Sequence, residues 1–387
     1  MTAEDLLTRT FAQVVEATDY PSTPLALVTA REAAIRRRRR RTTALVAAAA
    51  VLVGGGVTFG IVHGRTHPSR LAPVAPLPDL PGGPPPRIDY LVGDTYVSAS
   101  GARITAPVLQ RATEAARFGT GVLAATGNSR TDRLVKVWQV SDRGAQRLGC
   151  GLHDFAVSAT ADPAYWLAAS CHSRPRPGHV TPAGRLYVGT TSTRTPPGVN
   201  VFPVGRLTNG VVAWLTSGGA DVRHNAVVIA PDGSIHPIPH LFAPRTVSEK
   251  AGLVEGTRAD IEGSTVVDAA SGRRLWTTSS WTLSRFSPSG RLVAGFDQAT
   301  QLTQAPQVGD AVAIFDAATG RQVLSRVLPG MSIVGPPVWE DEGSVLVVVE
   351  DHDHEQGIVR VGLDGSVTRA TPVAPEGQGT FRLADTP

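Results

Sequence analysis

The sequence is poor in charged residues, and lysine is almost absent. Only 18% of its 387 residues are charged, and Lys136 and Lys250 are the only lysines. Glycine and proline, which interrupt helices, number 40 and 30 and follow no collagen-like period. A coiled coil or a helical bundle is therefore excluded. The hydrophobic content of 42% is too high for a wholly disordered chain, and the length allows one large β domain or two ordinary domains.

Common catalytic motifs are also missing. The sequence contains no HExxH motif, no P-loop and no Ser, His and Asp in the order of a nucleophilic triad. Some enzymes use carboxylates or histidines that line a channel through the fold, but a single sequence does not reveal which residues would line such a channel. We therefore predict no catalytic residue, no cofactor and no enzymatic activity.

One segment, residues 351–355, has the residue types of a metal site. It reads Asp-His-Asp-His-Glu, and strand alternation would place His352 and His354 on one face. The segment follows the apolar run at 345–349 and precedes a strand expected at Ile358. This position is typical of a solvated hairpin loop, so we predict a loop here and no metal site.

The charge is unevenly distributed along the chain. Residues 1–41 hold eight arginines, six of them in the run 36–41, against five acidic residues. The other residues carry 29 basic and 28 acidic side chains. A nucleic-acid-binding domain would show a basic surface, so this balance argues against a nucleic-acid partner.

Directly after the arginine run, residues 42–62 form 21 uncharged positions, TTALVAAAAVLVGGGVTFGIV. About 20 apolar residues span a bilayer as a helix. The alternatives are a buried soluble helix, in which the three glycines at 54–56 would be costly, and a cleaved signal peptide, which a preceding stretch of 41 residues argues against. We expect one signal-anchor helix, with the N-terminus cytoplasmic and the C-terminus extracellular by the positive-inside rule. Gly56 and Gly60 form a GxxxG pair that allows close helix packing.

Two further segments flank this span. Residues 1–41 are expected to be a cytoplasmic tail with two short helices, separated by the Tyr-Pro-Ser-Thr-Pro stretch at 20–24. These helices have too few large apolar residues for an independent core, so they are either loosely ordered or docked on a cytoplasmic partner. Residues 63–87 are rich in proline and are expected to form an extended linker that holds the next domain, residues 88–387, away from the membrane.

From residue 88 onward, a short strand, a glycine turn and a second short strand recur. Six copies are visible, at 96–104, 137–148, 227–238, 265–276, 313–324 and 359–370. Their turn glycines are separated by 43, 89, 39, 48 and 45 residues. The interval of 89 is two periods, which predicts a degenerate copy near 184–205. Asp-Gly and Ser-Gly between apolar residues are hairpin turns, and a period of about 44 is that of propeller blades rather than of a β-sandwich.

A second motif keeps phase with the first. The segments FSPSGRLVAGF (286–296), VWEDEGSVLVVV (338–349) and VTPAGRLYVG (180–189) each have an apolar start, a glycine and an apolar strand. Paired with AIFDAATGRQVL (313–324), this motif resembles the repeat of TolB-type and WD-repeat-like β-propellers. The whole layout resembles membrane-anchored propeller proteins of actinobacteria. The closely similar part is about 280–370, and no blade has the Gly-His and Trp-Asp pairs of true WD repeats. The resemblance supports an all-β propeller, and we predict about seven blades, with six or eight as alternatives.

The two cysteines, Cys150 and Cys171, both lie in the part expected outside the cell. An oxidising compartment favours a disulfide between them, and closing that loop would contribute about 3 kcal/mol in the chain-entropy model. Two free buried thiols are the alternative.

The ends of the propeller are expected to meet. Residues 88–97 and 379–384 lie outside the complete strand–turn–strand copies, and each contains an apolar strand without a partner. A propeller ring is commonly closed by strands from both ends of the chain, which leaves no open edge. We therefore predict that these two segments belong to one blade.

For function, the sequence favours a non-enzymatic extracellular module for protein interaction or sensing, because propeller loops surround a rigid channel. A second hypothesis is a transmembrane regulator whose tail binds a cytoplasmic transcription (sigma) factor, although the tail lacks an HxxxCxxC zinc motif. A third is an extracytoplasmic propeller enzyme, namely a hydrolase, a lyase or a quinone-dependent dehydrogenase. The identity of the protein partner or ligand does not follow from the sequence.

Overall fold

The computed structural model describes eleven ranges of the chain, all of them within one compact unit. They are residues 74–127, 135–151, 163–168, 184–189, 191–195, 199–217, 225–239, 241–257, 263–297, 310–374 and 380–384. Within these ranges, no helix has the length and apolar character needed to cross a bilayer. The predicted tail (1–41) and membrane span (42–62) lie outside the described residues.

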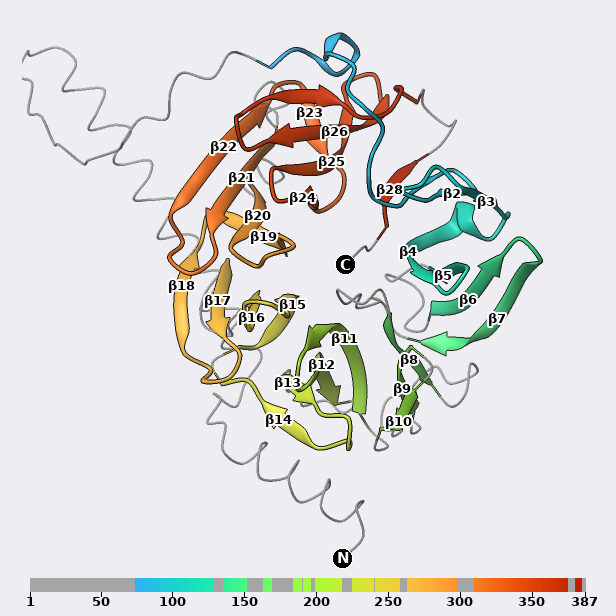
Figure 1. Cartoon of the computed structure of the whole chain (residues 1–387), viewed down its shortest axis with the longest axis vertical. Coiled ribbons are helices and arrows are strands. Elements are labelled where there is room, and N and C mark those ends of the chain that lie inside the picture. Colours follow the sequence, from blue (N-terminus) through green and yellow to red (C-terminus); the bar gives the residue numbers. More distant parts are fainter. Residues whose placement is uncertain are drawn as a thin grey trace, which may run out of the picture. The chain divides into compact units, whose positions relative to one another are not determined.

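Six antiparallel sheets surround a common centre, which is the arrangement of a β-propeller (Figure 1). The first sheet contains β28 (Phe381–Leu383), β1 (Tyr90–Val92), β2 (Thr95–Val97) and β3 (Arg103–Thr105). The second contains β4 (Ala112–Phe118), β5 (Gly121–Thr126), β6 (Val135–Ser141), β7 (Gly144–Gly151), β8 (Ala164–Ala168), β9 (Gly184–Val188) and β10 (Thr191–Arg194). The third contains β11 (Val199–Leu207), β12 (Gly210–Ser217), β13 (Asn225–Ile229) and β14 (Ile235–Pro237).

The second half of the chain forms the other three sheets. The fourth contains β15 (Ala243–Ser248), β16 (Leu253–Thr257), β17 (Ser264–Asp268) and β18 (Arg274–Thr278). The fifth contains β19 (Trp281–Phe286), β20 (Leu292–Asp297), β21 (Asp310–Asp316) and β22 (Gln322–Leu328). The sixth contains β23 (Met331–Ile333), β24 (Val338–Asp341), β25 (Ser344–Asp351), β26 (Gln356–Gly362) and β27 (Val367–Arg369). The described helices are two 3₁₀ turns, η1 (Leu77–Asp79) and η2 (Leu109–Arg111).

The all-β propeller is as predicted, but the predicted count of seven blades is wrong, because the described residues form five separate blades and one larger sheet. Five sheets have the four or five strands of a single blade, and they are separate from one another. The remaining sheet has seven strands, because β7 and β8 pair through Gly151 and Leu167 and thereby join two groups of strands.

The predicted strand–turn–strand copies are confirmed. Each forms the outer hairpin of its group of strands, and each turn glycine has a φ between 66° and 122°, the left-handed region that other residues rarely adopt. These glycines are Gly101, Gly144, Gly233, Gly272, Gly320 and Gly365. The degenerate copy is the hairpin of β9 and β10, whose turn contains Gly189 with a φ of 56°.

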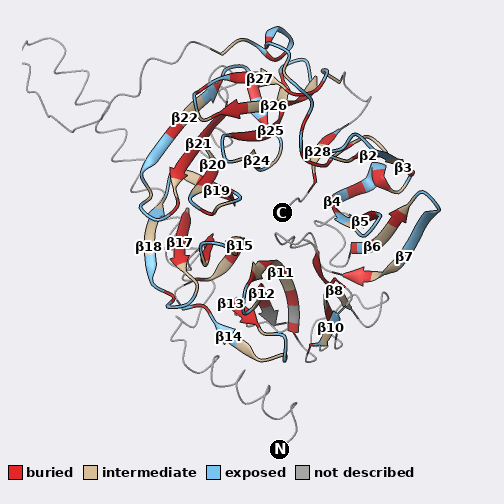
Figure 2. Cartoon of the chain, viewed as in Figure 1, coloured by how far each residue is buried: buried red, intermediate tan, exposed pale blue. Residues whose placement is uncertain are grey.

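The hydrophobic core lies between neighbouring sheets. The middle strands of the sheets are almost wholly buried, whereas the outer strands β7, β18 and β22 carry exposed residues (Figure 2). One cluster joins Val312 and Ile314 of β21 to Val347 and Val359 of the sixth sheet. Because both faces of the middle strands are covered, these strands are apolar runs rather than alternating patterns.

The predicted closure of the ring is also confirmed. β28 pairs with β1 in antiparallel register, with Tyr90 opposite Leu383 and Val92 opposite Phe381. Phe381 is buried in a cluster that includes Ile88 and residues of the sixth sheet. The two ends of the propeller therefore share one sheet, so neither end leaves an unpaired edge at the junction.

A buried carboxylate links the closing sheet to its neighbour. Asp89 accepts hydrogen bonds from the Tyr96 hydroxyl, the Ala99 amide and the Arg117 guanidinium of β4, the last with an Nη2–Oδ1 distance of 3.0 Å. Burial, the hydrogen bond to Asp89 and its negative charge raise the pKa of the Tyr96 hydroxyl. This side-chain network therefore reinforces the backbone pairing of the ring closure.

Residues 74–87, which the sequence assigns to the linker, pack against the propeller, and we call them the strap. Leu77 is fully buried in the core cluster of the sixth sheet. Backbone hydrogen bonds join the Gly83 amide to the Arg369 carbonyl and the Arg369 amide to the Pro81 carbonyl, each at 2.8 Å. The strap thus extends the outer edge at β27 and covers part of its backbone.

Candidate functional site

A cavity of about 910 Å³ is lined by residues from several of the sheets, and we call it the axial cavity. Its walls come from the strands nearest the centre in Figure 1, including β4, β11, β15, β19 and β28, and from the segment between β23 and β24. That segment, residues 334–337, contains two consecutive prolines and divides the inner edge of the sixth sheet into two short strands. A concave site enclosed by several blades is a usual location for a ligand.

Four of the inner strands share one irregularity that shapes the axial cavity. The pairing register shifts between Ala112 and Glu114 in β4, Pro203 and Gly205 in β11, Pro244 and Thr246 in β15, and Leu283 and Phe286 in β19. The positions left out of the register include Thr113, Val204, Arg245 and Arg285, and all four line the cavity. A β-bulge redirects a side chain out of the regular alternation, so the bulges determine what faces the cavity.

Arg382 of β28 contributes a partly buried cation to the axial cavity. Its guanidinium donates hydrogen bonds to the carbonyl of Ala112, to the carbonyl of Gln110 at 3.2 Å and to the hydroxyl of Thr380 at 2.6 Å. These three acceptors are neutral. Burial lowers the pKa of Arg382, since removal from water disfavours the charged form.

Arg245 of β15 forms an ion pair at the wall of the same cavity. Its Nη2 lies 2.6 Å from Oε1 of Glu255 on β16, and also donates to the hydroxyl of Ser264. Glu255 is fully buried, and burial raises its pKa although Arg245 and Ser264 stabilise the carboxylate. The charge of Arg245 is therefore largely balanced within the protein.

The remaining charged groups of the cavity wall are Arg111 of η2, Arg285 of β19 and Glu114 of β4. Among the described residues that line the cavity, Glu114 is the sole carboxylate. A carboxylate can accept a proton from water, and guanidinium groups can stabilise a developing negative charge. The cavity wall thus contains one group that can act as a base and several that can stabilise an anion.

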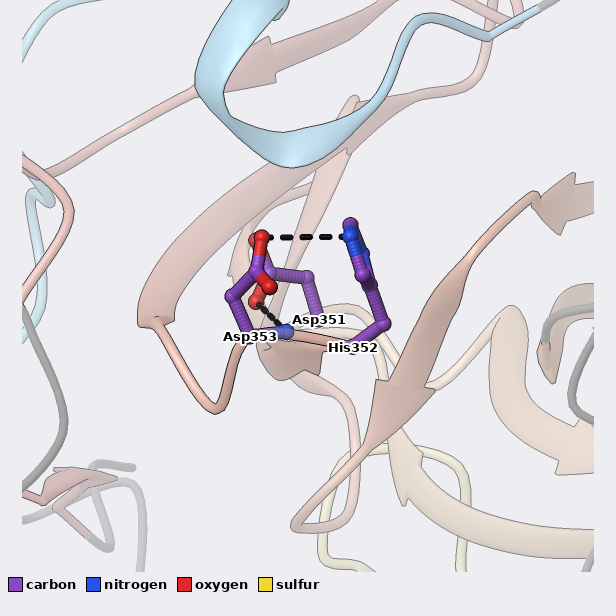
Figure 3. A group of neighbouring side chains, drawn as sticks. All are labelled: Asp351, His352 and Asp353. Atoms are coloured by element: carbon purple, nitrogen blue, oxygen red, sulfur yellow. Dashed lines mark hydrogen bonds and ion pairs between the residues drawn. The ribbon is translucent and has the colours of Figure 1, made fainter.

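The metal-type cluster predicted to be a loop is a turn between β25 and β26, which confirms the loop (Figure 3). Ligand atoms of Asp351, His352 and Asp353 lie within 4.8 Å of one another. Asp351 Oδ1, however, accepts hydrogen bonds from the amides of Asp353 and Glu355, each at 3.0 Å, and so stabilises the turn. The side chains of His352 and Asp353 are 80% and 68% exposed, and His354 contacts Glu350 instead.

A Ser–His pair occurs at the outer edge of the propeller. The hydroxyl of Ser234 lies 3.0 Å from Nε2 of His236 and donates to Oδ1 of Asp232 at 2.7 Å. In a nucleophilic triad the carboxylate contacts the imidazole, whereas here it contacts the hydroxyl. The arrangement is an exposed turn of the β13–β14 hairpin and not a catalytic triad.

Cys150 is buried on β7, with 4% of its surface exposed. None of the described cysteines is free. Because Cys171 lies outside the described residues, the disulfide between them stays a prediction.

No protein-family model matches the sequence, and no curated protein matches it. Solved structures with a similar architecture include the acylaminoacyl peptidase of Pyrococcus horikoshii, which is 10% identical with a TM-score of 0.45, covering 72% of this chain and 47% of that chain. The β-propeller domain of the Trilobed protease from Pyrococcus furiosus is 8% identical with a TM-score of 0.47, covering 73% and 87%. A structure from a study of two prolyl endopeptidases is 12% identical with a TM-score of 0.49, covering 77% and 48%.

These comparisons correct the prediction of a non-enzymatic module. Peptidases recur among the similar structures. This chain spans about half the length of the acylaminoacyl peptidase and of the prolyl endopeptidase. At these identities the likeness concerns the propeller alone, so the activity of this chain is considered below from its own residues.

Proposed function

We propose that this chain is an extracytoplasmic propeller enzyme that hydrolyses an acyl bond in its axial cavity. The observation that carries the proposal is the cavity of about 910 Å³, whose wall contains Glu114 together with four arginines. In such a partly enclosed site, electrostatic interactions are stronger than in bulk water.

The bulges in β4, β15 and β19 support this assignment, because they expose polar positions at the centre of an otherwise apolar fold. The bulge in β4 lies immediately before Glu114, and those in β15 and β19 include Arg245 and Arg285. Bulges next to active sites commonly redirect side chains in this way. Inner strands with regular pairing would serve the core equally well, so the repeated irregularity indicates a role for the cavity.

In the proposed mechanism, Glu114 acts as the general base and accepts a proton from the attacking water. The water oxygen bonds to the acyl carbon, and the carbonyl oxygen gains a negative charge. A cavity arginine stabilises this oxyanion. When the carbonyl re-forms, the bond to the leaving group breaks, and Glu114 gives the proton that it took from water to the leaving group. Truncating one such stabilising group typically costs 10²–10³-fold in kcat.

The experiment is a hydrolysis screen of the full-length protein in detergent with chromogenic esters, lactones and peptides. We expect turnover of at least one class, with a loss of 10²-fold or more in Glu114→Gln. Glu249→Gln is the matched control, since Glu249 lies in the turn between β15 and β16 and does not line the cavity. Equal activity in the wild type and in Glu114→Gln would place the reaction elsewhere.

We further propose that residues 42–62 anchor the enzyme in the cell membrane, with the propeller outside. The support is the uncharged stretch of 21 residues that directly follows the arginines at 36–41. Protease added to intact cells should remove the propeller and leave a fragment of the size of the tail plus the span. Full protection of the C-terminal part would contradict this topology.

A further inference from the structure

The axial cavity carries an excess of positive charge on its wall. Its lining residues include Arg111, Arg245, Arg285 and Arg382 but only one carboxylate, Glu114. Glu255 balances the charge of Arg245 from behind the wall. An excess of cations in a partly enclosed space is unfavourable unless an anion compensates it.

One of these arginines, Arg382, lies beside the backbone of a second, Arg111. Arg382 donates hydrogen bonds to the carbonyls of Gln110 and Ala112, which are the chain neighbours of Arg111. The C-terminal strand and the η2–β4 segment therefore bring Arg382 beside the backbone of Arg111, and both residues line the cavity. Two arginines from segments far apart in sequence therefore line the same cavity.

The partners of Arg382 leave its charge uncompensated within the described part of the chain. The carbonyls and the hydroxyl that accept its hydrogen bonds are neutral. Burial lowers its pKa, with no opposing contribution from a carboxylate. Other arginines of the propeller show the usual alternative, since Arg117, Arg245 and Arg360 each contact an acidic side chain.

We infer that the axial cavity binds the carboxylate or phosphate group of an anionic ligand through Arg382 and Arg111. This inference rests on the proposed hydrolase, for which it names an anionic substrate class. A guanidinium suits both groups as a charged donor. In Arg382 the Nε–H and one Nη1–H make no described hydrogen bond, since the described acceptors take both Nη2–H groups and one Nη1–H. The backbone acceptors of Arg382 hold the guanidinium at the wall before the ligand arrives.

The test is a direct binding measurement that does not depend on turnover. Full-length protein in detergent is titrated calorimetrically with succinate and, separately, with inorganic phosphate, at an ionic strength held constant with chloride. The two titrations distinguish a carboxylate site from a phosphate site. Saturable binding of at least one anion supports the inference, and binding of neither overturns it.

Three variants assign the binding to the proposed residues. Arg382→Met and Arg111→Met should each weaken the Kd of the bound anion at least tenfold. The matched control is Arg274→Met, which removes an exposed arginine from the outer strand β18. Arg111 has no described hydrogen bond across the closure of the ring, so its variant remains informative if Arg382→Met does not fold. Equal weakening in all three variants would indicate a general charge effect and overturn the inference.

The two proposals can fail separately. Anion binding that depends on Arg382 and Arg111, combined with no hydrolysis in the screen, would contradict the hydrolase and leave the anion site standing. Hydrolysis that depends on Glu114, combined with unchanged anion affinity in the arginine variants, would contradict the anion site alone.

Discussion

Arg360 of β26 holds the buried carboxylate of Glu340 in a bidentate ion pair, with Nε–Oε2 and Nη2–Oε1 distances of 2.6 and 2.8 Å. The same carboxylate accepts the backbone amide of Arg87 at 2.7 Å, while Arg360 also donates to the carbonyls of Pro84 and Pro85. The pair therefore links the sixth sheet to the end of the strap. Two side chains of the propeller thus fix the direction in which the chain enters the ring.

Replacing Glu340 by glutamine should destabilise the propeller by about 3 kcal/mol, because Arg360 would keep its charge without a compensating carboxylate. The free energy of unfolding from urea titration measures this change. Glu249→Gln, which alters a turn residue away from the strap, should have little effect. Equal stability of Glu340→Gln and the wild type would mean that the ion pair does not hold the strap.

The stability of the propeller should fall with acidification partly through Glu340. Burial opposes its ionisation, but the hydrogen bonds from Arg360 and from the Arg87 amide outweigh burial, so its pKa lies below the usual value. Its contribution is therefore complete above the unfolded-state pKa of about 4.3 and is lost as the pH falls through the lower folded-state pKa. Turn aspartates such as Asp268 and Asp316 have lowered pKa values too, through hydrogen bonds from Ser271 and Thr319.

Because several carboxylates titrate in this range, the comparison with Glu340→Gln isolates the one of interest. Urea midpoints between pH 7 and pH 3 should fall less steeply in the variant than in the wild type. Parallel curves would show that Glu340 does not contribute to the acid sensitivity.

Deleting residues 379–387 should destabilise the whole ring rather than remove a loose end. The deletion takes away β28, leaves β1 without its partner and removes the buried side chain of Phe381. Loss of a buried phenylalanine alone costs about 3–5 kcal/mol. Thermal unfolding of the truncated protein should therefore begin at a clearly lower temperature. Removal of 385–387 alone, which spares β28, is the control.

The turn at Asp351 should not depend on a metal ion. Asp351 Oδ1 is engaged by backbone amides, and His352 and Asp353 are largely exposed, so we expect zinc, calcium and chelators to leave the unfolding temperature unchanged. A saturable increase with zinc or calcium that is lost in His352→Ala would establish a metal site at this turn.

A disulfide between Cys150 and Cys171 should contribute about 3 kcal/mol to stability if the protein folds in an oxidising compartment. Mass spectrometry of the non-reduced protein should find the two cysteines in one cross-linked peptide pair. Detection of both as free thiols would contradict the prediction.

The propeller and its closure could be predicted because they depend on local chemistry and on the pattern of apolar strands. Gly101, Gly320 and Gly365 mark turns that need a positive φ, and this need is visible in the sequence as Gly between apolar strands. The sequence also predicted that the strands within residues 88–97 and 379–384 pair with each other, because each lacked another partner. The predicted blade count was wrong because the single pairing of Gly151 with Leu167 has no sequence signal.

The axial cavity could not be predicted from the sequence. Arg245 and Arg285 line the cavity because their strands are bulged. A bulge changes the direction of a side chain, but it leaves no mark on the neighbouring residues in the sequence. Arg382 lies beside η2 only after the ring has closed. The strap was missed for a similar reason: Leu77 is fully buried, but its proline-rich surroundings are typical of an extended linker.

In the bulged inner strands, the residues that line the cavity are different from the residues that pack the core. Thr113 and Arg285 lie outside the regular pairing and line the cavity, whereas residues such as Ala115 and Val212 are buried in the core between sheets. Substitutions at the bulged positions can therefore change the lining of the cavity while the sheets keep their packing. This division allows the ligand preference of the ring to diversify, in evolution or in a designed library, at little cost in foldability.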